Sequence, residues 1–206
     1  MPRVVPPFYL FLGAVTWPVI HGLYRYDIQG IENLPKDSGY VLCSNHLSSF
    51  DPWPLGLALW PRQQLRFMAK SELFNPVLKK PMEATGAFPV RRGEGDMDAM
   101  KTAIRLAKSG EIVAMFPEGT RPKKGLRKKH EARPHTGAAR IALGAKVPLV
   151  PAALKGTDGL SRFARLHVSY GPPVPIDDLH GLSHREAAQV ATDRLMDAIR
   201  TLYDDL

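Results

Sequence analysis

Short apolar runs with the residue types of buried β-strands recur seven times along the chain. The predicted strands are Tyr24–Ile28, Tyr40–Ser44, Leu65–Ala69, Ala87–Arg91, Ile112–Phe116, Pro148–Leu154 and Leu166–Tyr170. Helical patterns lie between several of these runs. Strand–helix alternation of this kind predicts a mixed α/β layer structure, and the 206 residues suit one ordinary domain.

Three helices are predicted from apolar spacing and from signals at their ends. They are Asp96–Lys108, Thr136–Leu143 and a last helix that begins at Ser183. The apolar stripe of the first is formed by Met97, Met100, Ile104 and Ala107. Asp96 is placed to cap that helix. Glu186, three residues after Ser183, completes a capping box for the last one.

Residues 1–24 are predicted to form a membrane-associating segment ahead of a domain over residues 25–206. The apolar run Phe8–Ile20 would span about 20 Å as a helix, short of a hydrocarbon core of about 30 Å, and Pro18 would kink it. Aromatic residues of the kind found at lipid headgroup level occur along the run. Three interpretations stay open: an interfacial helix, a buried core helix, and a secretory signal, although no small-residue cleavage site follows.

Positive charge is concentrated in one loop. The chain has a net charge of +8, and its segment Arg121–Arg133 contains seven basic residues and a single acidic one. A patch of this kind suits an anionic membrane surface, polyphosphates or nucleic acid, and a solvated loop without a partner is the alternative. The single cysteine, Cys43, excludes a disulfide framework and a cysteine-based zinc cluster. No run approaches the about 20 apolar residues of a spanning helix.

The stretch SNHLSSFD, from Ser44 to Asp51, places a histidine at a strand end and a carboxylate five residues after it. On a straight helix the two side chains would point about 140° apart, so a turn must bring His46 and Asp51 together. A carboxylate bonded to one imidazole nitrogen fixes the tautomer and raises the basicity of the other nitrogen, which makes a general base. A capping aspartate and a surface histidine are the alternative interpretation.

Two further segments carry weaker signals of a binding site, and a third carries none. In FPEGTR, an apolar strand runs into a turn that Gly119 permits, and Arg121 offers a rigid fork of donors. GAFPVRR ends in Arg91 and Arg92, which suit a phosphate. VPLVP is a buried strand to which no chemistry is assigned. Taken alone, the first two also fit an ordinary turn and a pair of solvated arginines.

In this order and at these separations, NHLSSFD, GAFPVRR, FPEGTR and VPLVP resemble the four sequence blocks of the glycerolipid acyltransferase family, most closely the bacterial 1-acylglycerol-3-phosphate acyltransferases. The resemblance implies a mixed, mostly parallel sheet of about seven strands flanked by helices. It also implies a catalytic dyad of His46 and Asp51. The residues that it assigns to substrate binding are Asn45, Lys70, Arg92, Glu118, Gly119, Thr120 and Arg121. Pro89 and Arg91 depart from the family pattern, which leaves the exact acceptor open.

The resemblance implies direct transfer of a fatty acyl chain from acyl-CoA or acyl carrier protein to the free hydroxyl of 1-acylglycerol-3-phosphate, giving phosphatidic acid. No metal or redox cofactor is expected, because thioesters are intrinsically reactive. The expected partners are the two substrates, acyl carrier protein and an anionic membrane, with no nucleic acid. The expected location is the cytoplasmic face of the cell membrane, in a peripheral or monotopic mode. The alternatives are the same chemistry on glycerol-3-phosphate, another lysophospholipid or a glycosylated phosphoinositide, and a non-enzymatic basic module that binds membrane or nucleic acid.

Overall fold

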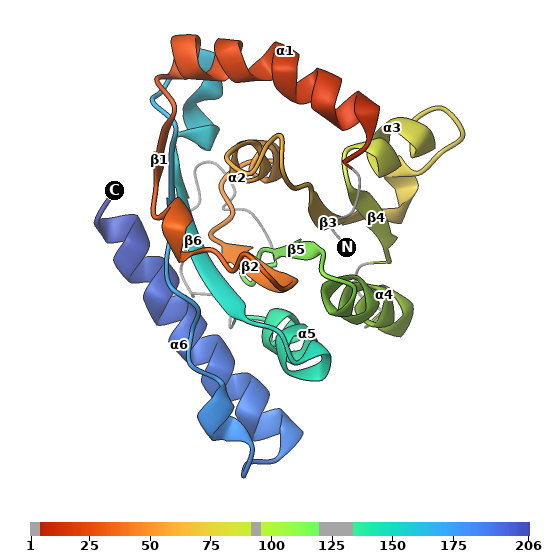
Figure 1. Cartoon of the computed structure of the whole chain (residues 1–206), viewed down its shortest axis with the longest axis vertical. Coiled ribbons are helices and arrows are strands. Elements are labelled where there is room, and N and C mark those ends of the chain that lie inside the picture. Colours follow the sequence, from red (N-terminus) through yellow and green to blue (C-terminus); the bar gives the residue numbers. More distant parts are fainter. Residues whose placement is uncertain (1–4, 92–95, 120–133) are drawn as a thin grey trace.

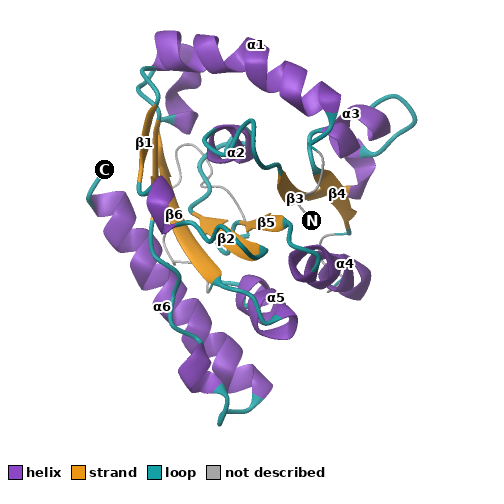
Figure 2. Ribbon diagram, in the orientation of Figure 1, coloured by secondary structure: helices purple, strands orange, loops and turns teal. Residues whose placement is uncertain are grey.

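The structure, a computed structural model, describes residues 5–91, 96–119 and 134–206. Within them, seven strands form one sheet in the order β1-β7-β6-β2-β5-β3-β4 (Figures 1 and 2). The strands are β1 (Asp27–Gln29), β2 (Tyr40–Ser44), β3 (Leu65–Lys70), β4 (Ala87–Val90), β5 (Ile112–Met115), β6 (Leu149–Lys155) and β7 (His167–Tyr170). Neighbouring strands run parallel, except that β6 and β7 pair antiparallel. The predicted mixed, mostly parallel sheet is confirmed.

Helices cover both faces of the sheet (Figure 1). On one face lie α1 (Pro7–Tyr24) and α2 (Pro52–Leu57), and on the other lie α4 (Met97–Lys108), α5 (Gly137–Ala145) and α6 (His184–Asp204). A further helix, α3 (Lys79–Ala84), packs near β4. Short 3₁₀ segments are η1 (Ile31–Asn33), η2 (Ser71–Leu73), η3 (Thr157–Arg162) and η4 (Asp177–Leu179).

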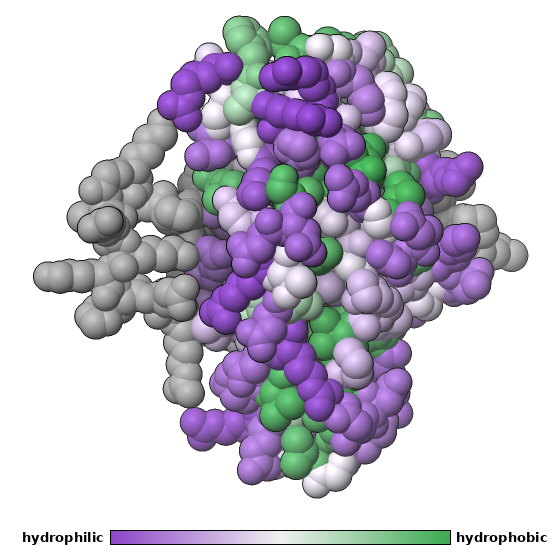
Figure 3. Space-filling view, turned by 90° about the vertical axis from the view of Figure 1, so that its left-hand side faces the viewer, coloured by the Kyte–Doolittle hydropathy of each residue, from purple (hydrophilic) through white to green (hydrophobic). Residues whose placement is uncertain are grey.

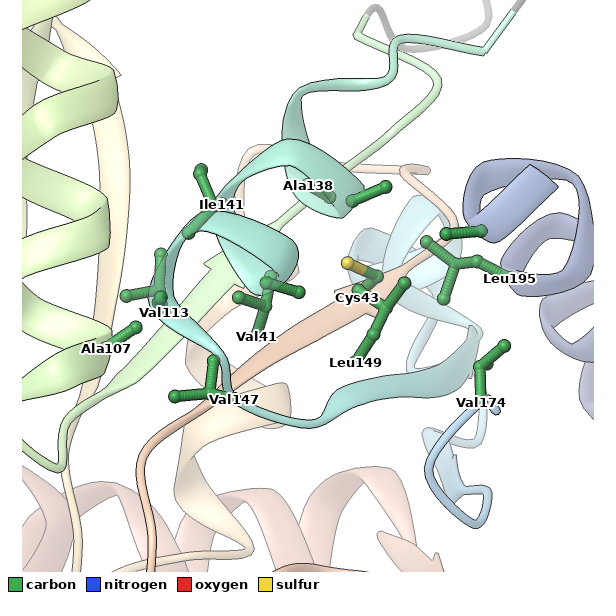
Figure 4. Close-up of a cluster of buried hydrophobic side chains, with 14 of the residues drawn as sticks. Val41, Cys43, Ala107, Val113, Ala138, Ile141, Val147, Leu149, Val174 and Leu195 are labelled. Carbon is green, nitrogen blue, oxygen red and sulfur yellow. The ribbon is translucent and has the colours of Figure 1, made fainter. Parts of the chain in front are cut away.

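The alternation of side chains along β2 supplies a core to each face. Tyr40 and Leu42 pack under α1 and α2, whereas Val41 and Cys43 pack under α4, α5 and α6 (Figure 4). All four side chains are completely buried. Successive side chains of a strand point to opposite faces, so a parallel strand that is covered on both sides is a nearly continuous apolar run. This explains why β2 has the bounds that its apolar run predicts.

Every predicted strand overlaps an observed one, and the main correction concerns the first. The prediction began this strand at Tyr24, but β1 begins at Asp27. The reason is that α1 continues to Tyr24 and ends where Arg25 adopts a left-handed backbone conformation, with φ of 45°. The capping box at the start of α6, between Ser183 and Glu186, is confirmed.

The predicted apolar stripe of α4 is partly wrong. Met97 is 55% exposed, whereas the buried positions are Ala99, Ala103, Leu106 and Ala107. Small alanine side chains let α4 lie close against its neighbour α5. The face of α4 that packs in the core is therefore the one that carries these alanines, and Met97 lies outside it.

Helix α1 packs through one of its sides over α2 and the segment that follows α2, with contacts from Tyr9 to Trp53 and from Trp17 to Trp60. Tyr9, Gly13 and Ile20 are buried, and the helix continues through Pro18. A Cβ atom at Gly13 would lie 2.2 Å from Nε1 of Trp60, so glycine permits the close approach of the helix backbone to this indole. In the part of the chain that is described, no helix is both long and apolar enough to cross a membrane. The division into segments 1–24 and 25–206 stays a prediction.

Candidate active site

The carboxyl ends of the parallel strands bring predicted site residues to one edge of the sheet. His46 follows β2, Lys70 is the last residue of β3, and the turn that contains Glu118 follows β5. These strands are neighbours in the order β2-β5-β3 and run in the same direction. In open α/β sheets, ligands bind at this edge. The topology therefore collects residues that are far apart in the sequence.

A tight turn joins the histidine to the carboxylate. Nδ1 of His46 lies 2.7 Å from Oδ2 of Asp51. The same oxygen accepts hydrogen bonds from the backbone N–H groups of Leu47, at 2.7 Å, and Ser48, at 2.9 Å. The carboxylate thus holds the intervening turn in shape while it orients the imidazole. This is the turn that the spacing of the two residues requires.

The hydrogen bonds to Asp51 determine where the imidazole carries its proton. The Asp51 carboxylate is completely buried, and a fourth donor group, the hydroxyl of Thr157, reaches its Oδ1 atom at 2.6 Å. An ionised carboxylate can only accept hydrogen bonds, so Nδ1 of His46 is the donor in their contact. In the neutral ring, Nε2 is then the unprotonated nitrogen. His46 consequently presents a basic nitrogen on the side away from Asp51.

An aromatic ring covers one face of the imidazole. The rings of His46 and Phe116 stack with centroids 4.3 Å apart and planes inclined by 20°. Phe116 directly follows β5, so the neighbouring strand supplies this contact. The His46 side chain remains 12% exposed. Stacking and the bond to Asp51 together restrict both the tilt and the rotation of the ring.

Asn45 is fully engaged with the neighbouring strand β6. Its Nδ2 donates to the carbonyl of Leu154 at 2.9 Å, and its Oδ1 accepts from the N–H of Leu154 at 2.8 Å. The hydroxyl of Ser44 also donates to Oδ1, at 3.1 Å. The carboxamide therefore fastens the end of β2 to the end of β6. The contact of Asn45 with substrate stays a prediction. In the structure, this side chain links two neighbouring strands.

The turn after β5 requires glycine. Gly119 has φ of 69°, and a Cβ atom there would lie 2.5 Å from Cδ2 of His135. The N–H of Gly119 donates to the carbonyl of Phe116, and the N–H of His135 donates to that of Pro117, both at 2.9 Å. The turn and the start of the segment before α5 are thus held together. Glycine accommodates both the left-handed backbone and the close imidazole.

Several of the predicted anion-binding residues lie outside the described part of the chain. These are Arg92, Thr120 and Arg121, together with the basic loop Arg121–Arg133. Of the remaining predicted residues, Lys70 is exposed and Glu118 is partly buried. Arg91 is engaged by Asp96, whose Oδ2 accepts from its N–H at 2.8 Å and lies 3.9 Å from its Nε.

Cys43 lies on the other side of the sheet from α1 and α2, within the apolar cluster of α4, α5 and α6 (Figure 4). Burial raises the pKa of its thiol. The reactive thiolate is therefore disfavoured, and Cys43 serves as a small hydrophobic side chain. Among residues 5–91, 96–119 and 134–206, no three His, Cys, Asp or Glu side chains are grouped as metal ligands.

Sequence reasoning missed two contributors to this arrangement, Phe116 and Thr157. The sequence predicts Phe116 only as the end of a strand, and no local pattern shows that its ring will stack on the imidazole of His46. Thr157 stands 106 residues from Asp51. A weak signal exists in the glycine and threonine that follow directly after the buried strand β6, because glycine at a strand end marks a sharp change of direction.

A mostly parallel sheet with an oriented histidine–carboxylate pair at its carboxyl edge defines an α/β protein equipped for general-base chemistry. The chain belongs to the acyltransferase family, whose sequence profile matches residues 25–155. The resemblance of the four sequence blocks to acyltransferases is thereby confirmed.

Individual relatives agree with this assignment. The 1-acyl-sn-glycerol-3-phosphate acyltransferase of Bacillus subtilis (strain 168) is 36% identical over 179 residues, which cover 85% of this chain and 86% of the relative. The protein of the same name from Streptococcus pneumoniae is 29% identical over 207 residues, or 96% of this chain and 74% of the relative. The crystal structure of the 1-acyl-sn-glycerophosphate (LPA) acyltransferase PlsC from Thermotoga maritima matches with a TM-score of 0.59 at 22% identity, covering 95% of this chain and 88% of that one. At this level of identity the match shows a shared fold.

Proposed function

We propose that this protein moves a fatty acyl chain from an acyl thioester, acyl-CoA or acyl carrier protein, to the free hydroxyl of 1-acylglycerol-3-phosphate, giving phosphatidic acid. The observation that carries the proposal is the 2.7 Å contact between His46 and the buried Asp51 at the carboxyl edge of the sheet. The acceptor is taken from the names of the relatives in Bacillus subtilis and Streptococcus pneumoniae.

The proposed reaction begins with proton transfer to the imidazole. Nε2 of His46 takes the proton of the acceptor hydroxyl while the oxygen forms a bond to the thioester carbonyl carbon. The tetrahedral intermediate then collapses, the carbon–sulfur bond breaks, and the sulfur leaves with the proton from the imidazolium. Asp51 stabilises the positive charge of that imidazolium through Nδ1. The reaction needs no cofactor besides the acyl thioester, because the carbonyl is already reactive toward an activated oxygen.

The acceptor phosphate is proposed to bind to cationic side chains at the same edge of the sheet. Lys70 is exposed at the end of β3, at the same edge of the sheet as the dyad. Arg92 and Arg121 are proposed partners on sequence grounds. Because Asp96 binds Arg91, we favour Arg92 as the arginine of this pair that binds the phosphate. Guanidinium groups are suited to phosphate because they donate two parallel hydrogen bonds.

Membrane association is proposed to occur through the outer side of α1. Large apolar side chains on this helix are exposed at every third or fourth position. They are Phe8 (47%), Phe11 (65%), Val15 (50%), Val19 (51%) and Leu23 (47%). The helix contains no Asp, Glu, Lys or Arg. In Figure 3, hydrophobic surface is visible at the top of the molecule, the end at which α1 lies in Figure 1. An apolar face of this length is what an interfacial helix buries in lipid.

The cytoplasmic face of the membrane is the proposed location. A coenzyme A thioester is too highly charged to cross a bilayer, so the donor determines the side on which the enzyme works. The basic loop Arg121–Arg133 would add attraction to anionic lipids or to acyl carrier protein. Vesicle binding that persists at high ionic strength would assign the anchoring to α1, because salt screens the charges of the loop and leaves apolar contacts intact.

The test of the proposed function is a panel of acceptors with one acyl donor. Lysophosphatidate, glycerol-3-phosphate and neutral lysophospholipids are supplied in parallel, and the products are identified by mass spectrometry. Phosphatidic acid should be the main product, and His46→Ala should abolish it. His180→Ala, which removes an exposed histidine next to η4, is the matched control and should remain active. Failure on every lysophosphatidate would overturn the proposed acceptor, and full activity of His46→Ala would overturn the dyad.

A further inference from the structure

A buried threonine completes the surroundings of the carboxylate of Asp51. The hydroxyl of Thr157 donates to Oδ1 at 2.6 Å, while the other three hydrogen bonds go to Oδ2. Thr157 is 2% exposed and Asp51 is completely buried. The contact joins the first residue of η3 to the turn after β2. Neither the sequence blocks nor the relatives assign a role to this residue.

The chain builds this contact with a specific backbone turn. Gly156 links β6 to η3 with φ of 92°, and a Cβ atom there would lie 2.0 Å from the carbonyl oxygen of Arg165. Only glycine fits this position, and it turns the chain so that the next residue faces the catalytic turn. Two residues earlier, Leu154 is held by the side chain of Asn45. The end of β6 is thus fixed to the end of β2 at two points.

We propose that Thr157 is a positioning residue for the acyl-transfer reaction. A carboxylate can rotate about its Cβ–Cγ bond, and this rotation decides where Oδ2 lies. By holding Oδ1, the hydroxyl of Thr157 keeps Oδ2 aimed at Nδ1 of His46. Without this hydroxyl, the buried Oδ1 atom has lost its hydrogen-bond donor, and rotation of the carboxylate toward another donor becomes favourable. The inference rests on the proposed roles of His46 and Asp51.

The expected consequence is a loss of turnover without a loss of substrate binding. Thr157→Val keeps the shape of the side chain and removes the hydroxyl. It should lower kcat by about 10-fold to 100-fold, the range for one hydrogen bond to a charged group, with KM for donor and acceptor nearly unchanged. Thr157→Ser keeps the hydroxyl and should restore most of the activity. Thr192→Val is the matched control, since Thr192 is 1% exposed and donates to the carbonyl of Ala188 within α6.

A spectroscopic measurement separates positioning from a merely structural role. The proton on Nδ1 of His46, identified by its absence in His46→Ala, should give a downfield NMR signal. In Thr157→Val this signal should move or broaden, and in Thr157→Ser and Thr192→Val it should stay in place. Should Thr157→Val fail to fold, Thr157→Ala, which leaves room for a water molecule, takes its place in both measurements.

Three results would overturn the inference. They are full kcat in folded Thr157→Val, equal losses in the valine and serine variants, and an unchanged Nδ1 signal in the valine variant. The His46→Ala enzyme distinguishes this failure from failure of the proposed function. If His46→Ala is inactive while Thr157→Val is normal, the dyad stands and the role of Thr157 is wrong. If His46→Ala is active, the dyad itself is wrong.

Discussion

Replacing Asp51 by asparagine tests the charge of the carboxylate with little change in its shape. Three N–H donors point at Oδ2, from His46, Leu47 and Ser48. The asparagine oxygen should therefore occupy that position, and its NH₂ group should face Thr157, whose hydroxyl can accept instead of donate. The imidazole keeps its tautomer in this arrangement. The substitution consequently removes a negative charge and leaves the hydrogen-bonded turn in place.

The size of the effect follows from the contact distance. A unit charge about 4 Å from the centre of the imidazolium, at an effective dielectric constant of about 20, is worth about 4 kcal/mol. Each step of about 1.4 kcal/mol in the barrier is a factor of ten, so kcat should fall about 1000-fold. This is less than the about 10⁴-fold loss that follows where the same substitution imposes the wrong tautomer.

Asp51→Ala should behave differently because it destroys the turn. It leaves the N–H groups of Leu47 and Ser48 and the hydroxyl of Thr157 without their acceptor. A buried unsatisfied group such as the Thr157 hydroxyl costs about 1–3 kcal/mol, and the two partly buried N–H groups add to this, so a loss of several kcal/mol and a fall in Tm of about 10 °C are expected.

The assay measures kcat by release of coenzyme A and Tm by circular dichroism for the wild type and both variants. Asp178→Asn is the control, because Asp178 is an exposed carboxylate paired with Arg194 at 2.7 Å, in η4 rather than at the site. The reasoning is refuted if folded Asp51→Asn keeps kcat within about 3-fold of the wild type. It is equally refuted if Asp51→Asn unfolds as readily as Asp51→Ala.

Three further substitutions test other parts of the structure. Cys43 should resist thiol reagents until the protein unfolds, because burial raises the pKa of its thiol, and Cys43→Ala should retain activity. Phe11→Asp places a charge on the exposed side of α1 and should reduce sedimentation with vesicles about 10-fold or more, without changing turnover of a soluble short-chain donor and acceptor. Gly119→Ala forces a side chain into left-handed backbone against His135 and should lower the free energy of unfolding by about 1–3 kcal/mol, measured by denaturant titration.

Each of these experiments has a clear contrary outcome. Rapid labelling of Cys43 in the folded protein would contradict its burial, and an inactive but folded Cys43→Ala would indicate a chemical role for the sulfur. Leu182→Asp, in the segment between η4 and α6, is the control for Phe11→Asp, since Leu182 is 45% exposed and does not belong to α1. Equal vesicle binding by both variants would remove α1 as the anchor. Unchanged stability of Gly119→Ala would show that the turn tolerates a Cβ atom.

The strands could be predicted from the sequence because each apolar run is buried as a unit. β2 is the clearest case, since helices cover both of its faces and its residues are apolar up to Ser44 at its end. The start of β1 could not be predicted in the same way. Tyr24 has a strand-like side chain, but the preceding helix packs over α2 and Trp60 and extends to this residue. Tertiary packing overrides local preference at this boundary.

The site was predictable where its parts lie close together in the chain. The spacing of His46 and Asp51 contains the turn that joins them, so a local pattern sufficed. The partners from other strands were not predictable, because Phe116 and Thr157 meet the dyad only once the strand order β6-β2-β5 is known. These three strands are far apart in sequence, and the periodicity of apolar residues does not predict which strands will be neighbours in the sheet.

The environments of the two dyad residues differ, and this difference has an evolutionary consequence. Asp51 is completely buried and accepts the main-chain hydrogen bonds that shape the turn, whereas the imidazole of His46 reaches solvent, so its replacement should cost the fold less than replacement of Asp51. A descendant of this chain that has lost its enzymatic activity should therefore keep the aspartate long after the histidine has drifted. An aspartate at this position without the histidine, in an otherwise intact turn, would mark a relative that has lost its activity. The presence of the aspartate alone would therefore overestimate how many members of a lineage are still active.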